Sequence, residues 1–226
     1  MNIYIFDSLI IIYHQDIVKL YTITEEIKHS FREKGSKFIG HLIPITSKED
    51  FESKLNDIKS KYPDATHHCY AWRLNPTNIK EFSQDDGEPS GTAGKPILNK
   101  LKSYEMVNCG CVVVRYYGGT NLGTSGLIQA YGQSTELCLE KAKRYTIIST
   151  QNIEITYPYH LQKQIDQLKN RFDLKEIDAQ YTDKVRLIMA CRSEQTDTFE
   201  QALQKLEHKG LSMTNKGSGY VILNTD

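Results

Sequence analysis

The order of hydrophobic patterns after Tyr145 is the feature that most constrains the fold of this chain. It predicts, in turn, a strand, a helix, two strands, a helix and a strand, and no glycine occurs between Gly132 and Gly210. The segments are a strand at 153–157, a helical stripe over 157–172, strands at 174–181 and 184–192, a helical stripe over 199–206 and a strand at 220–223. This βαββαβ order predicts a ferredoxin-like domain over residues 146–226.

Residues 21–145 carry different patterns and are predicted to form a separate α+β domain. Apolar residues are dense in Lys37–Ile45, which favours a mostly buried strand. Ser47 is predicted to cap the helix that follows, with Asp50 three residues further on. His68–Leu74 is predicted to be a second strand.

The rest of this domain is expected to contain a central strand and a long helix. Cys109–Tyr117 holds a continuous apolar run of the kind found in strands that are buried on both faces. A glycine-rich turn follows, and Thr124 or Ser125 is expected to cap a helix whose apolar stripe spans 127–138.

Composition excludes several classes of protein. Lys and Arg number 28, as do Asp and Glu, so the chain has no global charge that would attract nucleic acid or an anionic membrane. Any such binding must use a local patch. Five scattered cysteines argue against a disulfide framework and for the cytoplasm. Residues 1–20 are expected to form an N-terminal extension in which Ile3–Ile12, interrupted by Asp7, is too short for a membrane span and predicts a strand.

The first place to look for chemistry is the polar stretch Asn75–Lys95, which is too long for a simple turn and is predicted to be an irregular loop. Eight of the 14 glycines fall between Gly87 and Gly126. Such glycines allow a positive φ or a close approach of the backbone to a ligand, but tight loops within a crowded sheet need them equally.

An anion site is one interpretation of this region. Gly91–Pro96 resembles a phosphate loop but has Pro89 and Pro96 where that loop needs glycine and a hydroxyl residue. What remains is Arg115 at a strand end, a glycine turn, and a helix N-terminus at 124–126, which together favour an anion. The alternative is that Arg115 pairs with a nearby carboxylate: Asp85, Asp86 or Glu88.

Metal and acid–base chemistry have weaker support. His67 and Cys69, or Cys109 and Cys111, share a strand face, but their spacing matches no known zinc site and we expect no metal and no cofactor. The three carboxylates at 85–88 suit Mg²⁺ or proton transfer, although turn capping is the commoner use of such clusters.

Aromatic residues offer a third interpretation. Tyr70, Trp72, Tyr116 and Tyr117 lie beside histidines and Arg115, and aromatic rings next to basic groups grip single-stranded nucleic acid. Most of these rings are expected to lie in the core instead, because Tyr70 and Trp72 share one strand face.

Three segments together resemble the signature of the YigZ/Impact family: 67–72, 85–96 and 115–119. The resemblance covers residues 24–142 for the Impact-type domain, and the remainder is similar to the small C-terminal domain of the bacterial members. It implies an α+β protein whose first domain has the fold of domain 2 of ribosomal protein S5 and whose second resembles the ferredoxin-like last domain of elongation factor G. It also implies a link to translation, which the eukaryotic Impact protein regulates; that protein carries an additional N-terminal domain absent from this sequence, so its specific partner is not carried over.

The leading hypothesis is therefore a cytoplasmic, translation-linked binding protein that contacts RNA, the ribosome or a translation factor and no membrane. The expected groove is lined by ten residues: His67, His68, Asp85, Asp86, Glu88, Lys95, Arg115, Tyr117, Gly118 and Gly119. The rival hypothesis is a hydrolase-like, metal-assisted enzyme acting on a phosphorylated or peptide-like substrate, with Asp86 or Glu88 as base or metal ligand. A third hypothesis assigns the whole signature to maintenance of the fold.

Overall fold

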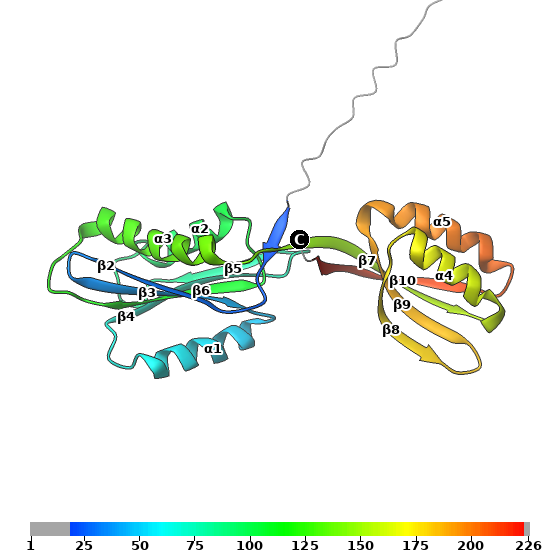
Figure 1. Cartoon of the computed structure of the whole chain (residues 1–226), viewed down its shortest axis with the longest axis horizontal. Helices are drawn as coiled ribbons and strands as arrows, with labels where there is room; N and C mark the ends of the chain where they lie inside the picture. The colour runs from blue at the N-terminus through cyan, green and yellow to red at the C-terminus, as the bar shows by residue number, and fades with distance from the viewer. Residues whose placement is uncertain (1–18, 224–226) are drawn as a thin grey trace, which may run out of the picture.

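The computed structural model describes residues 19–223, within which the chain forms ten strands and five α-helices arranged around two sheets. Figure 1 shows the two sheets side by side along the long axis of the molecule, each with its own helices. The predicted α+β class and its division into two parts are confirmed. The strand predicted at Ile3–Ile12 lies outside the described residues.

The first sheet is antiparallel and has helices on both faces. Its order is β2-β3-β6-β4-β5, with α1 on one face and α2 and α3 on the other (Figure 1). The bounds are Ile27–Glu33 for β2, Ser36–Pro44 for β3, His67–Leu74 for β4, Lys80–Gln84 for β5, Cys109–Tyr116 for β6, Lys48–Lys61 for α1, Gly94–Ser103 for α2 and Gly123–Lys141 for α3.

The central strand β6 explains why this sheet needs two helical layers. Cys111 and Val113 point into the core under α2 and α3, whereas Val112 and Val114 point into the core over α1. A strand covered on both faces gains from an unbroken apolar run, because every side chain leaves water. The predicted strand therefore appears in its predicted place.

Helix α1 begins as the sequence indicates. The Ser47 hydroxyl accepts a hydrogen bond from the Asp50 N–H at 3.1 Å, and the Asp50 carboxylate accepts one from the Thr46 N–H at 2.9 Å. These bonds satisfy backbone donors that a helix start leaves unpaired. The helix then buries Phe51, Leu55 and Ile58 against the sheet.

Two expectations for this domain are wrong. Asn75–Lys95 is not one irregular loop, because β5 pairs with β4 and α2 begins at Gly94. Neither Thr124 nor Ser125 caps α3, which starts one residue after Leu122 without a side-chain cap. The exposed edge strand β5, with the sequence Lys-Glu-Phe-Ser-Gln, lacks the apolar alternation that marks a half-buried strand. The start of α2 is capped by the Asp85 carboxylate, nine residues before Gly94 in the sequence.

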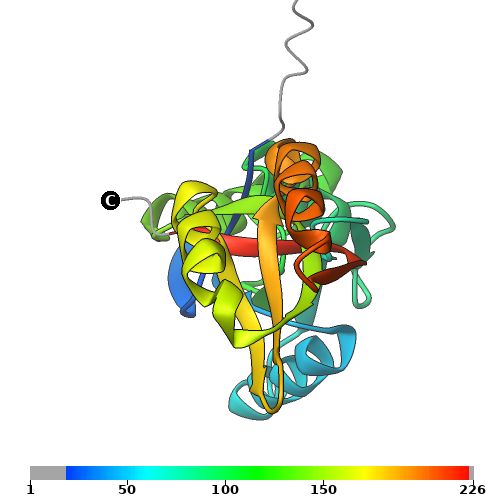
Figure 2. The ribbon, with the colours of Figure 1, turned by 90° about the vertical axis from the view of Figure 1, so that its right-hand side faces the viewer.

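The second sheet has the ferredoxin-like order β10-β7-β9-β8, antiparallel throughout. Helices α4 and α5 both cover one of its faces (Figures 1 and 2). A short 3₁₀ turn at Tyr159–Leu161 leads into α4. The bounds are Tyr145–Tyr157 for β7, Gln162–Arg171 for α4, Lys175–Tyr181 for β8, Val185–Arg192 for β9, Thr196–Glu207 for α5 and Ser212–Leu223 for β10.

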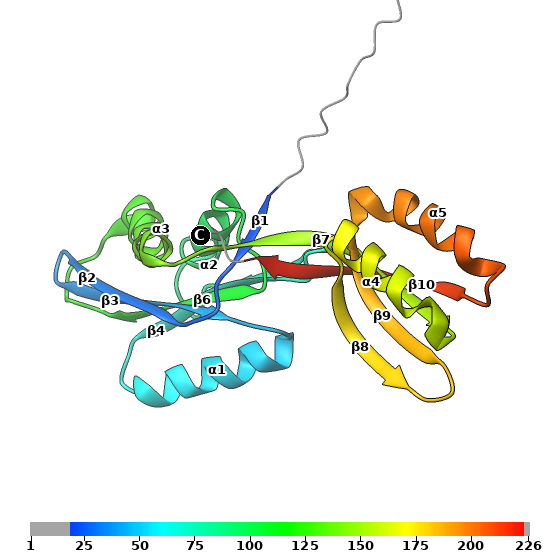
Figure 3. The same cartoon turned by 45° about the vertical axis from the view of Figure 1, so that its right-hand side comes forward.

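A short strand, β1 at Leu20–Thr22, joins the two parts (Figure 3). It pairs with the start of β7, where Leu20 lies opposite Ile147. On its other side the Tyr21 N–H donates to the Glu105 carbonyl at 3.0 Å, and the Val107 N–H donates to the Tyr21 carbonyl at 2.8 Å. Strand β1 belongs to the second sheet. Its Tyr21 is nevertheless hydrogen-bonded to a loop of the first domain.

Candidate functional site

A cleft of about 420 Å³ lies at the end of the first sheet that is farther from the second sheet. Four of the ten predicted groove residues line it: His67, Glu88, Arg115 and Tyr117. The start of α3, with Gly123 and Thr124, forms another wall. We call this space the signature cleft.

Strand pairing brings the cleft residues together. His67 on β4 and Phe38 on β3 lie directly opposite Arg115 on β6, one on each side. Directly opposed residues in antiparallel strands point to the same face of the sheet. The three side chains therefore form a row beneath α3, and Arg115 holds the middle position.

Arg115 is paired with Glu88, one of the three partners that the sequence allowed. Its Nη1 donates to Glu88 Oε1 at 2.5 Å, and the two side chains are only 6% and 4% exposed. Arg115 Nη2 donates to the Ser36 hydroxyl at 3.3 Å. The guanidinium lies 5.5 Å from the ring centres of both Phe38 and Tyr117. A buried ion pair of this kind fixes geometry more than it attracts a ligand, since each charge neutralises the other.

Glu88 has one further donor, and His67 lies nearby. The Tyr131 hydroxyl on α3 donates to Glu88 Oε1 at 2.7 Å, and His67 Nε2 lies 3.8 Å from the same oxygen. His67 Nδ1 lies 2.8 Å from the Asp86 carbonyl oxygen, which only accepts hydrogen bonds, so Nδ1 carries a proton. Glu88 is thus hydrogen-bonded from two elements, β6 and α3.

Asp85 caps helix α2 from a distance. Its carboxylate accepts hydrogen bonds from the N–H groups of Gly91, Ala93 and Gly94 at 2.8, 3.0 and 2.8 Å. Ala93, the N-cap residue, offers no side-chain acceptor of its own. The carboxylate satisfies donors at the positive end of the helix dipole, which is a structural task.

The side chains of Asp86 and His68 do not line the signature cleft. The Asp86 carboxylate accepts the His68 N–H at 2.7 Å. His68 faces α1, where its Nε2 donates to the Tyr62 carbonyl at 3.1 Å. Burial lowers the pKa of His68, with the Tyr62 hydrogen bond and the Asp86 charge acting in the opposite direction. Neighbouring residues on a strand point to opposite faces, which separates His68 from His67.

The remaining predicted residues lie around the cleft and do not line it. The Gly118 N–H donates to the Ser36 hydroxyl at 3.2 Å, and a Cβ on Gly118 would stand 1.9 Å from the Gly35 carbonyl carbon. Gly119 has a φ of 85° in open space. Lys95 is exposed on α2 and has no ion pair among residues 19–223. The ten residues therefore do not form a single groove.

The arrangement offers little to an enzymatic mechanism. Asp85, Asp86 and Glu88 each accept hydrogen bonds from different partners and do not converge on His68. Burial raises the pKa of the Cys69 thiol, whose S–H donates to the Asp85 carbonyl at 2.9 Å. Nowhere in the described part of the chain do three or more histidine, cysteine, aspartate or glutamate side chains gather as a metal site.

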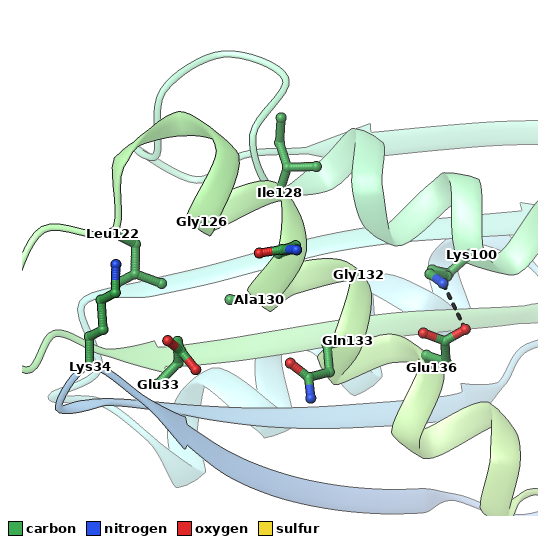
Figure 4. Close-up of a pocket in the computed structure, with 11 residues that line it drawn as sticks. Glu33, Lys34, Lys100, Leu122, Gly126, Ile128, Ala130, Gly132, Gln133 and Glu136 are labelled. Carbon is green, nitrogen blue, oxygen red and sulfur yellow. Dashed lines mark hydrogen bonds and ion pairs between the residues drawn. The ribbon is translucent and has the colours of Figure 1, made fainter.

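A wider hollow of about 630 Å³ lies over the outer side of α3 (Figure 4). Glu33 and Lys34 border one end, and Lys100 borders the other, where it pairs with Glu136 at 2.7 Å. Between them the lining is mostly small or uncharged residues of α3, including Gly126, Ala130 and Gly132. No group of chemically active side chains converges there, so the signature cleft is the better candidate.

Sequence patterns missed two residues that build the signature cleft. Ser36 joins Arg115 to Gly118, and Tyr131 reaches Glu88 from α3. Tyr131 belongs to the apolar stripe of its helix, and Ser36 is an isolated serine beside a turn. Neither has a local signal for its role, because both act through partners more than 40 residues away in sequence.

No helix within residues 19–223 is long and apolar enough to cross a membrane. The fold and the cleft define a two-domain α+β protein whose first domain holds an Asp-Asp-Gly-Glu-Pro segment around a buried Arg–Glu pair.

Comparison with known proteins agrees with this class. The Impact N-terminal domain matches residues 34–139. The chain is 32% identical to the IMPACT family member YigZ of Escherichia coli, over 85% of this chain and 92% of that protein. It is 31% identical to the IMPACT family member YvyE of Bacillus subtilis, over 82% and 86%. The protein belongs to the Impact family.

A crystal structure of a hypothetical protein has the same fold. It is 29% identical to this chain, superposes with a TM-score of 0.63, and covers 86% of this chain and 96% of its own. The likeness extends over most of both chains and so includes both sheets.

Proposed function

We propose that this protein is a translation-linked binding protein that contacts RNA, the ribosome or a translation factor through the signature cleft. The link to translation is supported by membership in the Impact family, to which the translation-regulating eukaryotic protein also belongs. The cleft itself supports binding, because Glu88 is held by Arg115 and Tyr131 in its interior, while its rim is left available.

The observation that carries the proposal is that an exposed aromatic ring, Tyr117, and the uncapped start of helix α3 line the same cleft. Tyr117 is 47% exposed at the mouth of the cleft. Helix α3 begins there without a side-chain cap and without an acidic residue in its first turn. Free N–H groups at the positive end of a helix suit a phosphate, and a tyrosine ring suits a stacked base.

These two features favour RNA among the three partner classes. Arg115 contributes little net charge because Glu88 neutralises it, so the attraction is local and short in range. This agrees with the equal numbers of basic and acidic residues in the chain. Affinity is expected to come from a few shaped contacts and to depend weakly on salt.

Co-sedimentation with ribosomes tests the proposal. The wild-type protein is expected in the ribosomal pellet, and two variants are expected to remain in the supernatant. Tyr117→Ala removes the stacking ring, and Thr124→Glu places a negative charge where the phosphate would lie. Both sites tolerate the change, since Tyr117 is exposed and an acidic residue favours a helix start.

Gln133→Ala, on the outer side of α3, is the matched control and is expected to behave as wild type. Wild-type protein that stays wholly in the supernatant would remove the basis of the proposal. Equal sedimentation of wild type, Tyr117→Ala and Thr124→Glu would move the contact away from the signature cleft.

A further inference from the structure

A second cleft, of about 520 Å³, opens where the two sheets meet. Its walls come from the start of α1, the end of β4, the start of β5, the loop before β6, and Tyr220 on β10. Figure 3 shows α1 and β4 reaching this side of the first sheet, next to the ribbon formed by β7 and β10. The signature cleft lies at the opposite end of the same sheet, so the two spaces share no lining residue.

Two nearly buried side chains present unused hydrogen-bond donors to this junction cleft. Trp72 and Asn108 are each 8% exposed and line the space. The Trp72 indole N–H makes no hydrogen bond within residues 19–223 and is not among the fully buried polar atoms there, and the Trp72 side chain lines the cleft. Asn108 accepts the Asn75 N–H through Oδ1 at 3.0 Å, and its Nδ2 amide makes no hydrogen bond to another residue in the described part of the chain. A ligand must therefore bring acceptors.

The rim carries charges of both signs, since the exposed Glu49 carboxylate lines it beside Lys48 and Lys80. Lys80 is exposed and has no ion pair in the described part of the chain, whereas Lys48 pairs with Glu52 at 3.3 Å. The start of α1 does not itself supply an anion site, because Ser47 and Asp50 already occupy its cap. An anionic group in the cleft would thus be held by Lys80.

Tyr220 supplies a flat apolar surface. Its side chain is 41% exposed although it lines the cleft. Trp72 already stacks on Phe82, with ring centres 6.0 Å apart and planes at 24°, so a ligand ring would stack on Tyr220. Aromatic stacking accepts any base, because every base has a π face.

We propose that the junction cleft binds a nucleotide. Carbonyl oxygens or ring nitrogens of the base accept hydrogen bonds from the Trp72 indole and the Asn108 amide, the base stacks on Tyr220, and the phosphate pairs with Lys80. A free nucleotide and one nucleotide of a single-stranded RNA present the same chemistry. This inference does not depend on the proposed function, because the signature cleft contributes no residue to it.

Trp72 is the single tryptophan of the chain and lies at the proposed site, so its fluorescence reports binding directly. Full-length protein is titrated with uridine monophosphate, and a saturable change in tryptophan emission is expected. Tyr220→Ala should weaken binding about fivefold or more, from the loss of one stacked base. Tyr181→Ala, another exposed tyrosine of the second sheet outside the cleft, should bind as wild type does.

A second variant isolates the indole donor. Trp72→Phe keeps an aromatic ring on Phe82 but removes the N–H, and its binding is measured by calorimetry. It should also weaken uridine monophosphate binding, while circular dichroism confirms that Tyr220→Ala and Trp72→Phe remain folded.

Two further ligands separate the sources of the chemistry. Tighter binding of a uridine homo-oligomer than of the monophosphate identifies single-stranded RNA as the source, and the reverse identifies a free nucleotide. Inorganic phosphate alone should bind far more weakly than either. The proposal is overturned if phosphate reproduces the monophosphate titration, if Tyr220→Ala binds as wild type does, or if neither uridine ligand produces a saturable change.

Discussion

At the scale of single residues, the charged side chains of the family signature bind mostly to other groups of the protein. Asp85 caps α2, Glu88 and Arg115 neutralise each other, and Asp86 holds the backbone of His68. The hypothesis of fold maintenance therefore accounts for these four residues better than direct ligand contact does. A ligand at the signature cleft meets the rim, where Tyr117 is exposed.

Removal of Arg115 is expected to lower stability strongly. Arg115→Ala leaves the Glu88 carboxylate buried without its cation, which costs about 3 kcal/mol or more of unfolding free energy. Urea denaturation followed by circular dichroism measures the change. Lys95→Ala, an exposed signature residue without an ion pair, should change the unfolding free energy by less than about 0.5 kcal/mol. Similar losses in both variants would contradict the structural role of the Arg–Glu pair.

Stability is expected to fall with acidity through His68. Burial lowers the pKa of the folded-state imidazole below its ordinary value of 6.5, so near that pH the unfolded chain binds a proton that the folded chain does not. The free energy of unfolding should be highest above pH 6.5 and decrease as the pH falls through it. Urea midpoints measured across this range test the trend.

The matched pair for this pH effect is His68→Gln and His208→Gln. His68→Gln should flatten the pH dependence, whereas His208→Gln, at an exposed position after α5, should leave it unchanged. His41 is also buried with a lowered pKa, so some dependence on pH should remain in the His68 variant. A slope unaffected by His68→Gln would exclude this residue as a cause.

At the scale of elements, the turn after β6 has to fit against the turn between β2 and β3. Gly118 lies so close to Gly35 that no side chain fits between the two backbones. Gly119, one position later, adopts a φ of 85° but faces open space. The two adjacent glycines thus serve different purposes, the first steric and the second conformational.

Alanine substitutions at Gly118 and Gly119 distinguish the steric role from the conformational one. Gly118→Ala should destabilise the protein by about 3 kcal/mol, because its Cβ meets backbone that cannot yield. Gly119→Ala should cost only about 1 kcal/mol, the strain of a left-handed backbone. Thermal unfolding of both variants gives the comparison, and a larger loss for Gly119→Ala would refute it.

The sequence predicted those elements whose pattern is local. The apolar run of β6, the Ser47 cap of α1, and the stripes after Tyr145 all fall in observed elements, although β7 and β10 begin at Tyr145 and Ser212, before the strands predicted at 153–157 and 220–223. The sequence patterns did not predict the polar edge strand β5. They also did not predict the start of α2, which Asp85 caps from nine residues away. The same limit applies to the cleft: a carboxylate partner for Arg115 was one of two alternatives that the sequence left open, but Tyr131 and Ser36 reach the pair only through folding.

At the scale of the whole molecule, β1 connects the two sheets. Tyr21 is bonded to Glu105 and Val107 of the first domain, and its neighbours pair with β7 of the second. The relative placement of the two domains, and with it the junction cleft, therefore depends on a strand of three residues.

Tyr21→Pro is expected to loosen this connection. Proline removes the N–H that donates to the Glu105 carbonyl. Small-angle X-ray scattering should show a broader distribution of distances between the domains, while circular dichroism retains the content of helix and strand. Lys19→Pro, just before β1, is the control and should scatter as wild type does. An unchanged scattering curve for Tyr21→Pro would show that the β7–β10 ribbon alone holds the domains.

The pairing of β7 with β10 has a consequence for protein engineering. Thr146, near the start of the second sheet, lies opposite Leu223 at its end, so the chain enters and leaves this part of the molecule at neighbouring points. A unit with adjacent ends can be inserted into a surface loop of a host without stretching either one. Residues 146–223 thus have the geometry of a transplantable cassette, and the first domain could accept a different one in its place.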